Sequence, residues 1–249
     1  MKNIGIFDSG IGGVTVLKEI KKILPNENYI YYSDSKNNPY GDKEKEKIIE
    51  ICDNILTKLL KEDCKAIVIA CNTASAISSD YLRKKYKEIP IIAIEPAYKM
   101  VYDYSYEKPT LIMATKGTIE SEKFNLLLKK YNNNKTYLLP CIGLADKIEK
   151  GNKEEIKEIL KLELEQYKGK VKNVVLGCTH YPLVKKEIKE ILGDDIEFFD
   201  GSPRLAIHLK EVLKEKNLIN EKNDGKIIFY DSKNDYKKEE RFFSILNQK

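Results

Sequence analysis

The chain has 249 residues, of which 42% are hydrophobic and 33% charged, as expected for a soluble globular protein with one large domain or two smaller ones. No apolar run approaches the roughly 20 residues that a membrane-spanning helix needs. The net charge of +5 arises from lysines interleaved with glutamates, as in "NKEEIKEILKLELEQYK", a pattern typical of solvated helix faces. No one-sided basic patch is visible, so we expect neither a nucleic-acid partner nor a membrane partner.

The amino-terminal sequence and the cysteines indicate a reducing compartment. "MKNIGIFDSG" has neither the apolar stretch nor the small-residue cleavage site of a signal peptide, and we interpret it as the first strand of the fold. The five cysteines are odd in number, irregularly spaced and free of any C-x-x-C motif. We therefore expect reduced thiols and a cytoplasmic location.

Short runs rich in Ile, Val and Tyr alternate with amphipathic segments along the chain. The runs predict nine buried strands, at residues 4–7, 29–33, 66–70, 91–94, 110–114, 136–139, 174–177, 196–199 and 226–230. Between them, apolar residues spaced three or four apart predict helices, most clearly at 16–24, 48–59 and 156–164. This repeated pattern predicts an α/β fold with mostly parallel sheets flanked by helices.

Two segments of the chain have the same form. "AIVIACNTASA" and "VVLGCTHYPL" each run from an apolar strand to a cysteine, a small polar residue and a helix. The best boundaries are a tyrosine-rich stretch between Pro96 and Pro109 and the segment "DGSPRLA" at 200–206. The repeated segment predicts two similar halves that face each other.

Several notable residues, most of them polar, fall where the predicted strands end, which is where open parallel sheets bind their ligands. These residues are Asp8, Ser9, Pro39, Tyr40, Gly41, Cys71, Asn72, Thr73, Thr115, Thr118, Ser121, Cys178, Thr179 and His180. The remaining cysteines and the second histidine have no such polar neighbours, and we interpret them as structural: Cys52, Cys64, Cys141 and His208.

Several kinds of site compete for these residues. "DSGIGG" partly matches a dinucleotide fingerprint, with Asp34 as the ribose acid, but Thr15 replaces the third glycine. A glycine-rich turn that leads into a helix, and that can bind a carboxylate, fits better. A zinc site of Cys71, Cys178 and His180 is disfavoured because zinc ligands usually come in closer pairs. A cysteine hydrolase would leave the second thiol without a role.

The pair of cysteines favours a different chemistry. A thiolate on one face of a carbon can remove a proton while a thiol on the opposite face returns one, which inverts the stereocentre. Because a free thiol has a pKa of about 8.5, each cysteine needs a neighbour that handles its proton. Asp8 and His180 are the candidates. Hydroxyl, amide and backbone N–H groups around a substrate carboxylate would stabilise the carbanion.

Six segments resemble the glutamate racemases, a family within the wider group of aspartate, hydantoin and related racemases. In chain order they are "IGIFDSGIGGVTVLKEI", "NNPYGDK", "VIACNTASA", "ATKGTIES", "VVLGCTHYPL" and "GKIIFYDSKND". The resemblance implies racemisation of L-glutamate to D-glutamate with no cofactor and no metal, supplying D-glutamate for peptidoglycan synthesis.

The resemblance also implies roles for individual residues. Cys71 and Cys178 would be the two bases, Cys71 for the D-enantiomer and Cys178 for the L-enantiomer, assisted by Asp8 and His180 respectively. Glu149 aligns with an acid that supports the second base, although "LPCIGLADKIEKG" departs from the family pattern, with Lys150 in place of a glutamate. The implied substrate shell is Asp8, Ser9, Tyr40, Gly41, Asn72, Thr73, Thr118, Thr179 and His180.

The implied architecture is two similar α/β domains with the active site in the cleft between them. Residues 1–96 plus 207–249 would form the first domain and residues 97–206 the second, and a homodimer is expected. Two other functions stay open: a racemase of another amino acid, chiefly aspartate, and a non-catalytic protein that binds a small ligand on a two-domain α/β frame.

Overall fold

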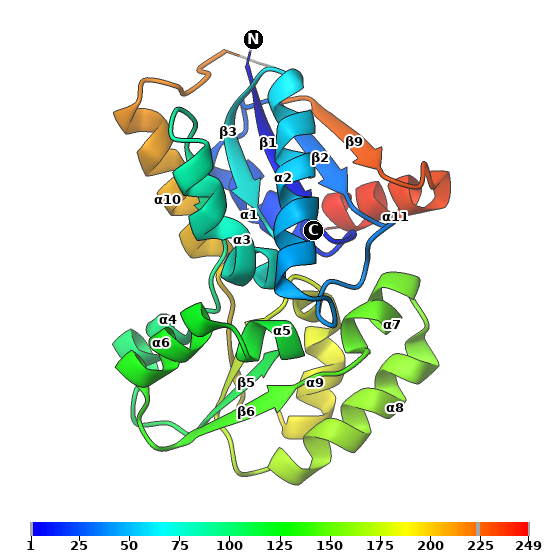
Figure 1. Ribbon diagram of the computed structural model, residues 1–249. Helices are drawn as coiled ribbons and strands as arrows, with labels where there is room; N and C mark the ends of the chain where they lie inside the picture. Colours follow the sequence, from blue (N-terminus) through cyan, green and yellow to red (C-terminus); the bar gives the residue numbers. More distant parts are fainter. Residues whose placement is uncertain (1, 223–224, 249) are drawn as a thin grey trace.

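Two parallel sheets, each flanked by helices, make up the computed structural model, which describes residues 2–222 and 225–248 (Figure 1). The first sheet has the order β4-β3-β1-β2-β9, with strands β1 (Asn3–Asp8), β2 (Tyr29–Ser33), β3 (Cys64–Ile69), β4 (Ile91–Ala93) and β9 (Ile227–Asp231). The second has the order β6-β5-β7-β8, with strands β5 (Thr110–Ala114), β6 (Thr136–Pro140), β7 (Asn173–Gly177) and β8 (Glu197–Phe199). The predicted α/β class and each predicted strand are confirmed.

Helices cover both faces of the first sheet because its strands are apolar on both sides. Ile4 and Ile6 of β1 point into a core shared with the helices α1 (Val14–Ile23), α10 (Ser202–Glu215) and α11 (Tyr236–Asn247). Phe7 points the opposite way, into a core shared with α2 (Lys45–Lys61) and α3 (Asn72–Lys85). Successive side chains of a strand alternate between faces, so a continuous apolar run requires cover on each.

The second sheet is covered in the same way. Leu111 and Met113 of β5 pack with α7 (Leu144–Lys150), α8 (Lys153–Leu164) and α9 (Lys185–Leu192). Ile112 packs on the other face with α4 (Tyr98–Ser105) and α6 (Glu122–Tyr131). The short elements of this half are α5 (Lys116–Ile119) and the 3₁₀ turns η1 (Glu165–Tyr167) and η2 (Tyr181–Val184). The tyrosine-rich stretch, expected as a boundary, thus contains a helix.

The chain enters the second half after β4 and returns through α10 (Figure 1). α10 begins at Ser202, and its Leu205 and Ala206 are buried in the core of the first half. The proposed boundary between residues 206 and 207 therefore falls inside a helix. We keep the two-domain division as a proposal and place its second boundary before α10.

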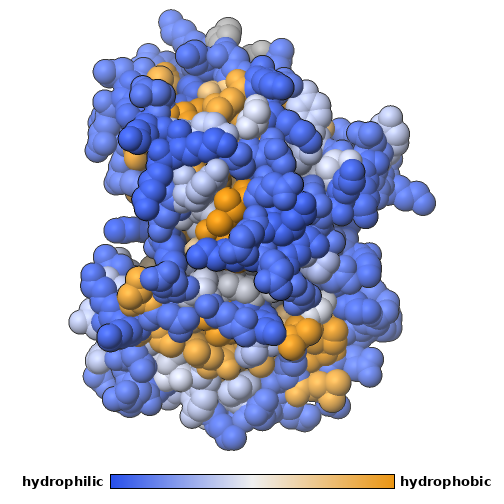
Figure 2. Space-filling view, viewed as in Figure 1, coloured by the Kyte–Doolittle hydropathy of each residue, from blue (hydrophilic) through white to orange (hydrophobic). Residues whose placement is uncertain are grey.

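The outer surface carries the charged faces of the helices. Hydrophilic side chains cover most of the face seen in Figure 2, and hydrophobic ones gather most extensively on the half built on the second sheet. Along the described ranges, no helix combines the length and the apolar character needed to cross a bilayer.

Candidate active site

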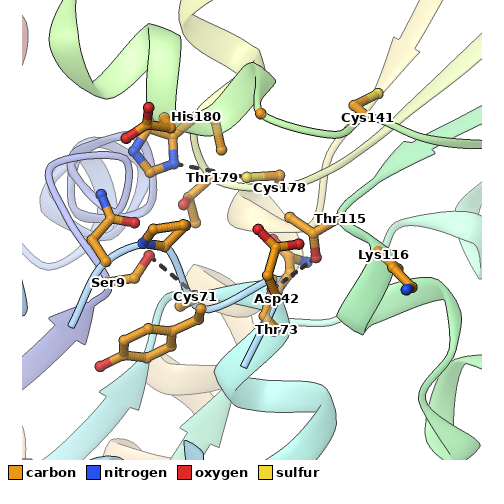
Figure 3. A pocket seen from close by; sticks show the side chains of 18 of the residues that line it. Ser9, Asp42, Cys71, Thr73, Thr115, Lys116, Cys141, Cys178, Thr179 and His180 are labelled. Carbon is orange, nitrogen blue, oxygen red and sulfur yellow. Dashed lines mark hydrogen bonds between the residues drawn. The ribbon is translucent and has the colours of Figure 1, made fainter. Parts of the chain in front are cut away.

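The two cysteine segments end at one cavity. This cavity, of about 50 Å³, lies between the carboxyl ends of the strands of both sheets (Figure 3). The predicted site residues that line it are Ser9, Tyr40, Gly41, Cys71, Asn72, Thr73, Cys178, Thr179 and His180. Asp8, Thr118 and Glu149 do not line it, but each is hydrogen-bonded to a residue that does.

Cys71 lies between β3 and α3, at the position that caps the helix. Its Sγ donates a hydrogen bond of 3.8 Å to Oγ of Ser9, which follows β1 (Figure 3). Burial raises the pKa of the Cys71 thiol, and the nearby Asp8 carboxylate raises it further. The surroundings of Cys71 therefore favour the protonated thiol, which is a proton donor.

Asp8 joins the two halves beneath the cavity. One of its carboxylate oxygens accepts a hydrogen bond from the backbone N–H of Gly10 and the other from Oγ1 of Thr179, both at 2.9 Å. The carboxylate is fully buried. Burial raises the pKa of Asp8, while the charge of His180 and these hydrogen bonds oppose the rise.

Cys178 is paired with a histidine that is itself held by an acid. Cys178 follows β7, and its Sγ lies 3.7 Å from Nδ1 of His180 (Figure 3). Nε2 of His180 lies 2.6 Å from Oε2 of Glu149 on α7. Burial lowers the pKa of His180, but its hydrogen bonds to Cys178 and Glu149 outweigh burial and raise it well above the ordinary value. An imidazolium next to a sulfur favours the thiolate.

Glu149 is surrounded by donors although it is almost fully buried. Its carboxylate accepts from the backbone N–H of Ile11 at 3.0 Å and lies 2.5 Å from Nζ of Lys238 on α11. Burial raises the pKa of Glu149, yet the hydrogen bond and charge of His180, together with Lys238, lower it to about 2. The carboxylate is therefore ionised at neutral pH.

The glycines of "DSGIGG" leave space for side chains of the second half. A Cβ at Gly10 would lie 2.4 Å from the Glu149 carboxylate, and a Cβ at Gly12 would lie 2.5 Å from Nδ1 of His180. Both contacts are shorter than any side chain tolerates. In this turn the glycines thus meet protein side chains, not a phosphate. Asp34, the ribose acid of the dinucleotide alternative, accepts a 2.6 Å hydrogen bond from the Tyr40 hydroxyl.

Hydroxyl and amide groups form the wall next to Cys71. The hydroxyls of Thr73 and Thr115 lie 2.8 Å apart, and that of Thr118 lies within 3.4 Å of both. Asn72 is buried, and its side-chain oxygen has no hydrogen-bond partner among the described residues. A buried polar atom without a partner costs free energy unless a ligand pairs with it. This wall could bind a polar group such as a carboxylate.

Sequence reasoning did not assign some residues of the site. Cys141 is buried in the core as predicted, but it also lines the cavity. The other lining residues that sequence reasoning did not single out are Asn38, Asp42, Lys116, Ile142, Gly143, Ala145 and Asp146, whereas Pro39 and Thr115 had been placed at strand ends without a role. Most adjoin a motif already singled out, so proximity in the chain was the available signal. For Lys238 no comparable signal existed, because lysines are frequent throughout the sequence.

Metal binding has no structural support within the described ranges. No group of three or more His, Cys, Asp or Glu side chains is arranged there to hold a metal ion. All five cysteines are free and buried. The chemistry that the site offers is proton transfer between two thiols, an imidazole and two carboxylates.

Two α/β halves, each contributing one thiol to a shared cavity, are the arrangement of the racemase class. The chain belongs to the Asp/Glu/Hydantoin racemase family, whose pattern matches residues 4–206. A glutamate racemase of Clostridium perfringens (strain SM101 / Type A) is 44% identical over 239 residues, which cover 94% of this chain and 92% of the relative.

Solved structures agree with this assignment. Glutamate racemase of Francisella tularensis in complex with D-glutamate is similar, with a TM-score of 0.84 and 33% identity, covering 100% of this chain and 94% of the other. The Escherichia coli glutamate racemase, solved with L-glutamate and the activator UDP-MurNAc-ala, has a TM-score of 0.84 and 28% identity, covering 99% and 94%.

Proposed function

We propose that this protein interconverts L- and D-glutamate without a cofactor, using Cys71 and Cys178 as two bases. The observation that carries the proposal is that these thiols come from different sheets and line one cavity, each beside its own proton-handling partner. The glutamate racemases to which the chain is similar support glutamate as the substrate.

The reaction from L- to D-glutamate begins at Cys178. Its thiolate, stabilised by the imidazolium of His180, takes the α-proton, so that an S–H bond forms as the C–H bond breaks. The Cys71 thiol then donates its proton to the opposite face of the carbanion. The negative charge ends on Cys71, where Asp8 assists the return of a proton. The D-enantiomer follows the same steps in reverse.

The polar wall of the cavity would hold the substrate. Asn72, Thr73 and Thr118 contribute amide and hydroxyl groups, and Ser9, Tyr40, Gly41, Thr179 and His180 complete the proposed shell. Donors directed at the carboxylate stabilise the charge that develops when the α-proton leaves. Glu149 would keep His180 oriented and charged.

Solvent isotope incorporation tests the two-base mechanism. Incubation of L-glutamate with the protein in D₂O, with no added cofactor, should give D-glutamate that carries deuterium at the α-carbon while the remaining L-glutamate stays protiated at early times. Mass spectrometry after chiral separation measures both pools. Equal early labelling of the two enantiomers contradicts a base on each face.

Single substitutions test each thiol. Cys71→Ser and Cys178→Ser should each lower kcat/KM by about 10³-fold or more, because a hydroxyl is a far weaker acid than a thiol. Circular dichroism follows the inversion. Cys64→Ala, at the start of β3 and outside the cavity, is the matched control and should retain activity.

The same assays separate the alternative functions. An aspartate racemase would invert L-aspartate faster than L-glutamate. A protein that only binds a small ligand would invert neither and would keep its affinity in both serine variants.

We further infer a cellular role in supplying D-glutamate for peptidoglycan synthesis, a cytoplasmic location and a homodimeric state. Depletion of the protein in its host should arrest growth in a way that external D-glutamate relieves. Light scattering coupled to size-exclusion chromatography should give about twice the chain mass of 28.8 kDa.

A further inference from the structure

The ion pair behind His180 extends to the carboxyl-terminal helix. Glu149 is shared between two cationic groups, with Oε2 at 2.6 Å from Nε2 of His180 and Oε1 at 2.5 Å from Nζ of Lys238. The side chains of His180, Glu149 and Lys238 are 2%, 6% and 14% exposed. Charges this deeply buried interact more strongly than surface pairs, since water screens them little.

Lys238 is held from its other side by the first sheet. Its ammonium also donates to Oγ of Ser35, and Ser35 donates to Oδ1 of Asp231 at the end of β9. A continuous row of contacts thus runs from Asp231 through Ser35, Lys238 and Glu149 to His180. The row ends at the sulfur of Cys178.

A neighbouring side chain on α11 performs a separate task. Arg241 donates to the backbone carbonyls of Glu149 and Ile148, with the Ile148 bond at 2.6 Å, and so holds the carboxyl end of α7. Arg241 contacts the backbone, whereas Lys238 contacts the carboxylate that orients His180. Arg241 therefore anchors α7 through its backbone, whereas Lys238 acts on the Glu149 carboxylate.

We propose that Lys238 is a positioning residue of the site. It holds the Glu149 carboxylate against His180 and pairs with part of the carboxylate's charge, and so sets the orientation and the charge of the imidazole next to Cys178. The inference rests on the proposed racemase function. The titratable groups that face this imidazole are Glu149 from α7, Cys178 after β7 and Asp8 from β1, with Lys238 of α11 behind Glu149.

A double-mutant cycle tests whether Lys238 acts through Glu149. Lys238→Met should lower kcat/KM about tenfold and Glu149→Gln about 100-fold. Because one acts through the other, the double variant should lie within about twofold of Glu149→Gln alone. Lys238→Arg, which keeps the cation, should retain most of the activity, and the exposed Lys237→Met on the same helix is the matched control. Losses that multiply in the double variant, or no rescue by arginine, overturn the proposal.

A spectroscopic measurement tests the same contact without turnover. The chain has only two histidines, His180 and the exposed His208, so ¹⁵N-labelled imidazole spectra resolve each ring. Lys238→Met should shift the His180 resonances, Lys238→Arg should restore them, and His208 should stay unchanged. An unshifted His180 overturns the proposal. If the wild-type protein does not racemise glutamate, the proposed function fails, while this spectrum still reports on the contact.

Discussion

At the scale of single residues, the site places different proton-handling surroundings around its two thiols. The Cys71 thiol is kept protonated by burial and by Asp8, whereas His180 is kept charged by Glu149. The proposed two-base mechanism needs this asymmetry, because one thiol must donate a proton while the other accepts one.

Glu149 should make the stability of the fold depend on pH in acid. Its pKa falls from the ordinary 4.5 to about 2, so its contribution is complete above about pH 4.5 and is lost as the pH falls toward 2. The shift corresponds to on the order of 3 kcal/mol of unfolding free energy. Glu149→Gln should therefore be less stable at neutral pH and should lose less stability on acidification than the wild type.

Urea unfolding at several pH values between about 3 and 6 measures this difference. Carboxylates far from Glu149 affect both proteins equally, so the comparison isolates Glu149 together with the groups coupled to it, Asp8 and His180. Parallel stability curves for the two proteins contradict the prediction.

At the scale of elements, strand ends and helix starts place the chemistry. Cys71 precedes α3 and Cys178 follows β7, so each thiol stands where a rigid strand meets a turn. The start of α11 is fixed by a helix cap. Asp235 accepts hydrogen bonds from the backbone N–H groups of Lys237 and Lys238. The cap thus fixes the backbone from which Lys238 reaches Glu149.

Loss of this cap should weaken the first turn of α11. Asp235→Ala should lower the unfolding free energy by about 1 kcal/mol, the usual cost of removing a helix cap, and Asp235→Asn should cost much less because asparagine also caps. Urea unfolding of the two variants measures both effects. Equal stability of the alanine variant and the wild type contradicts the assignment.

At the scale of the whole molecule, function depends on how closely the two halves approach. Thr179 of the second half donates to Asp8 of the first, a contact between residues 171 positions apart. The side chains of Glu149 and His180 pack against the glycine turn after β1. A Cβ atom on Gly10 or Gly12 would occupy the space that these side chains fill. The site therefore exists only when both halves are docked.

Gly12→Ala should disturb this approach and leave each half folded. Because the added Cβ would lie 2.5 Å from His180 Nδ1, the ring must move by about an ångström, which typically costs about 10²-fold in rate. Racemisation measured by circular dichroism should fall by that amount, with far-ultraviolet spectra unchanged. Cys64→Ala, outside the cavity, again serves as the control and should retain activity. Full activity of Gly12→Ala contradicts the close packing described.

Local sequence patterns were enough to predict the α/β class, the strands and the two thiols at strand ends, because alternation and helical periodicity are properties of neighbouring residues. They also indicated Asp8 and His180 as partners, since each lies in or near a motif. The packed fold was needed to reveal that Gly10 and Gly12 make room for Glu149 and His180, and that Lys238 forms an ion pair with Glu149. Those contacts join residues far apart in the chain, and they arise from the docking of two sheets, which no local pattern encodes.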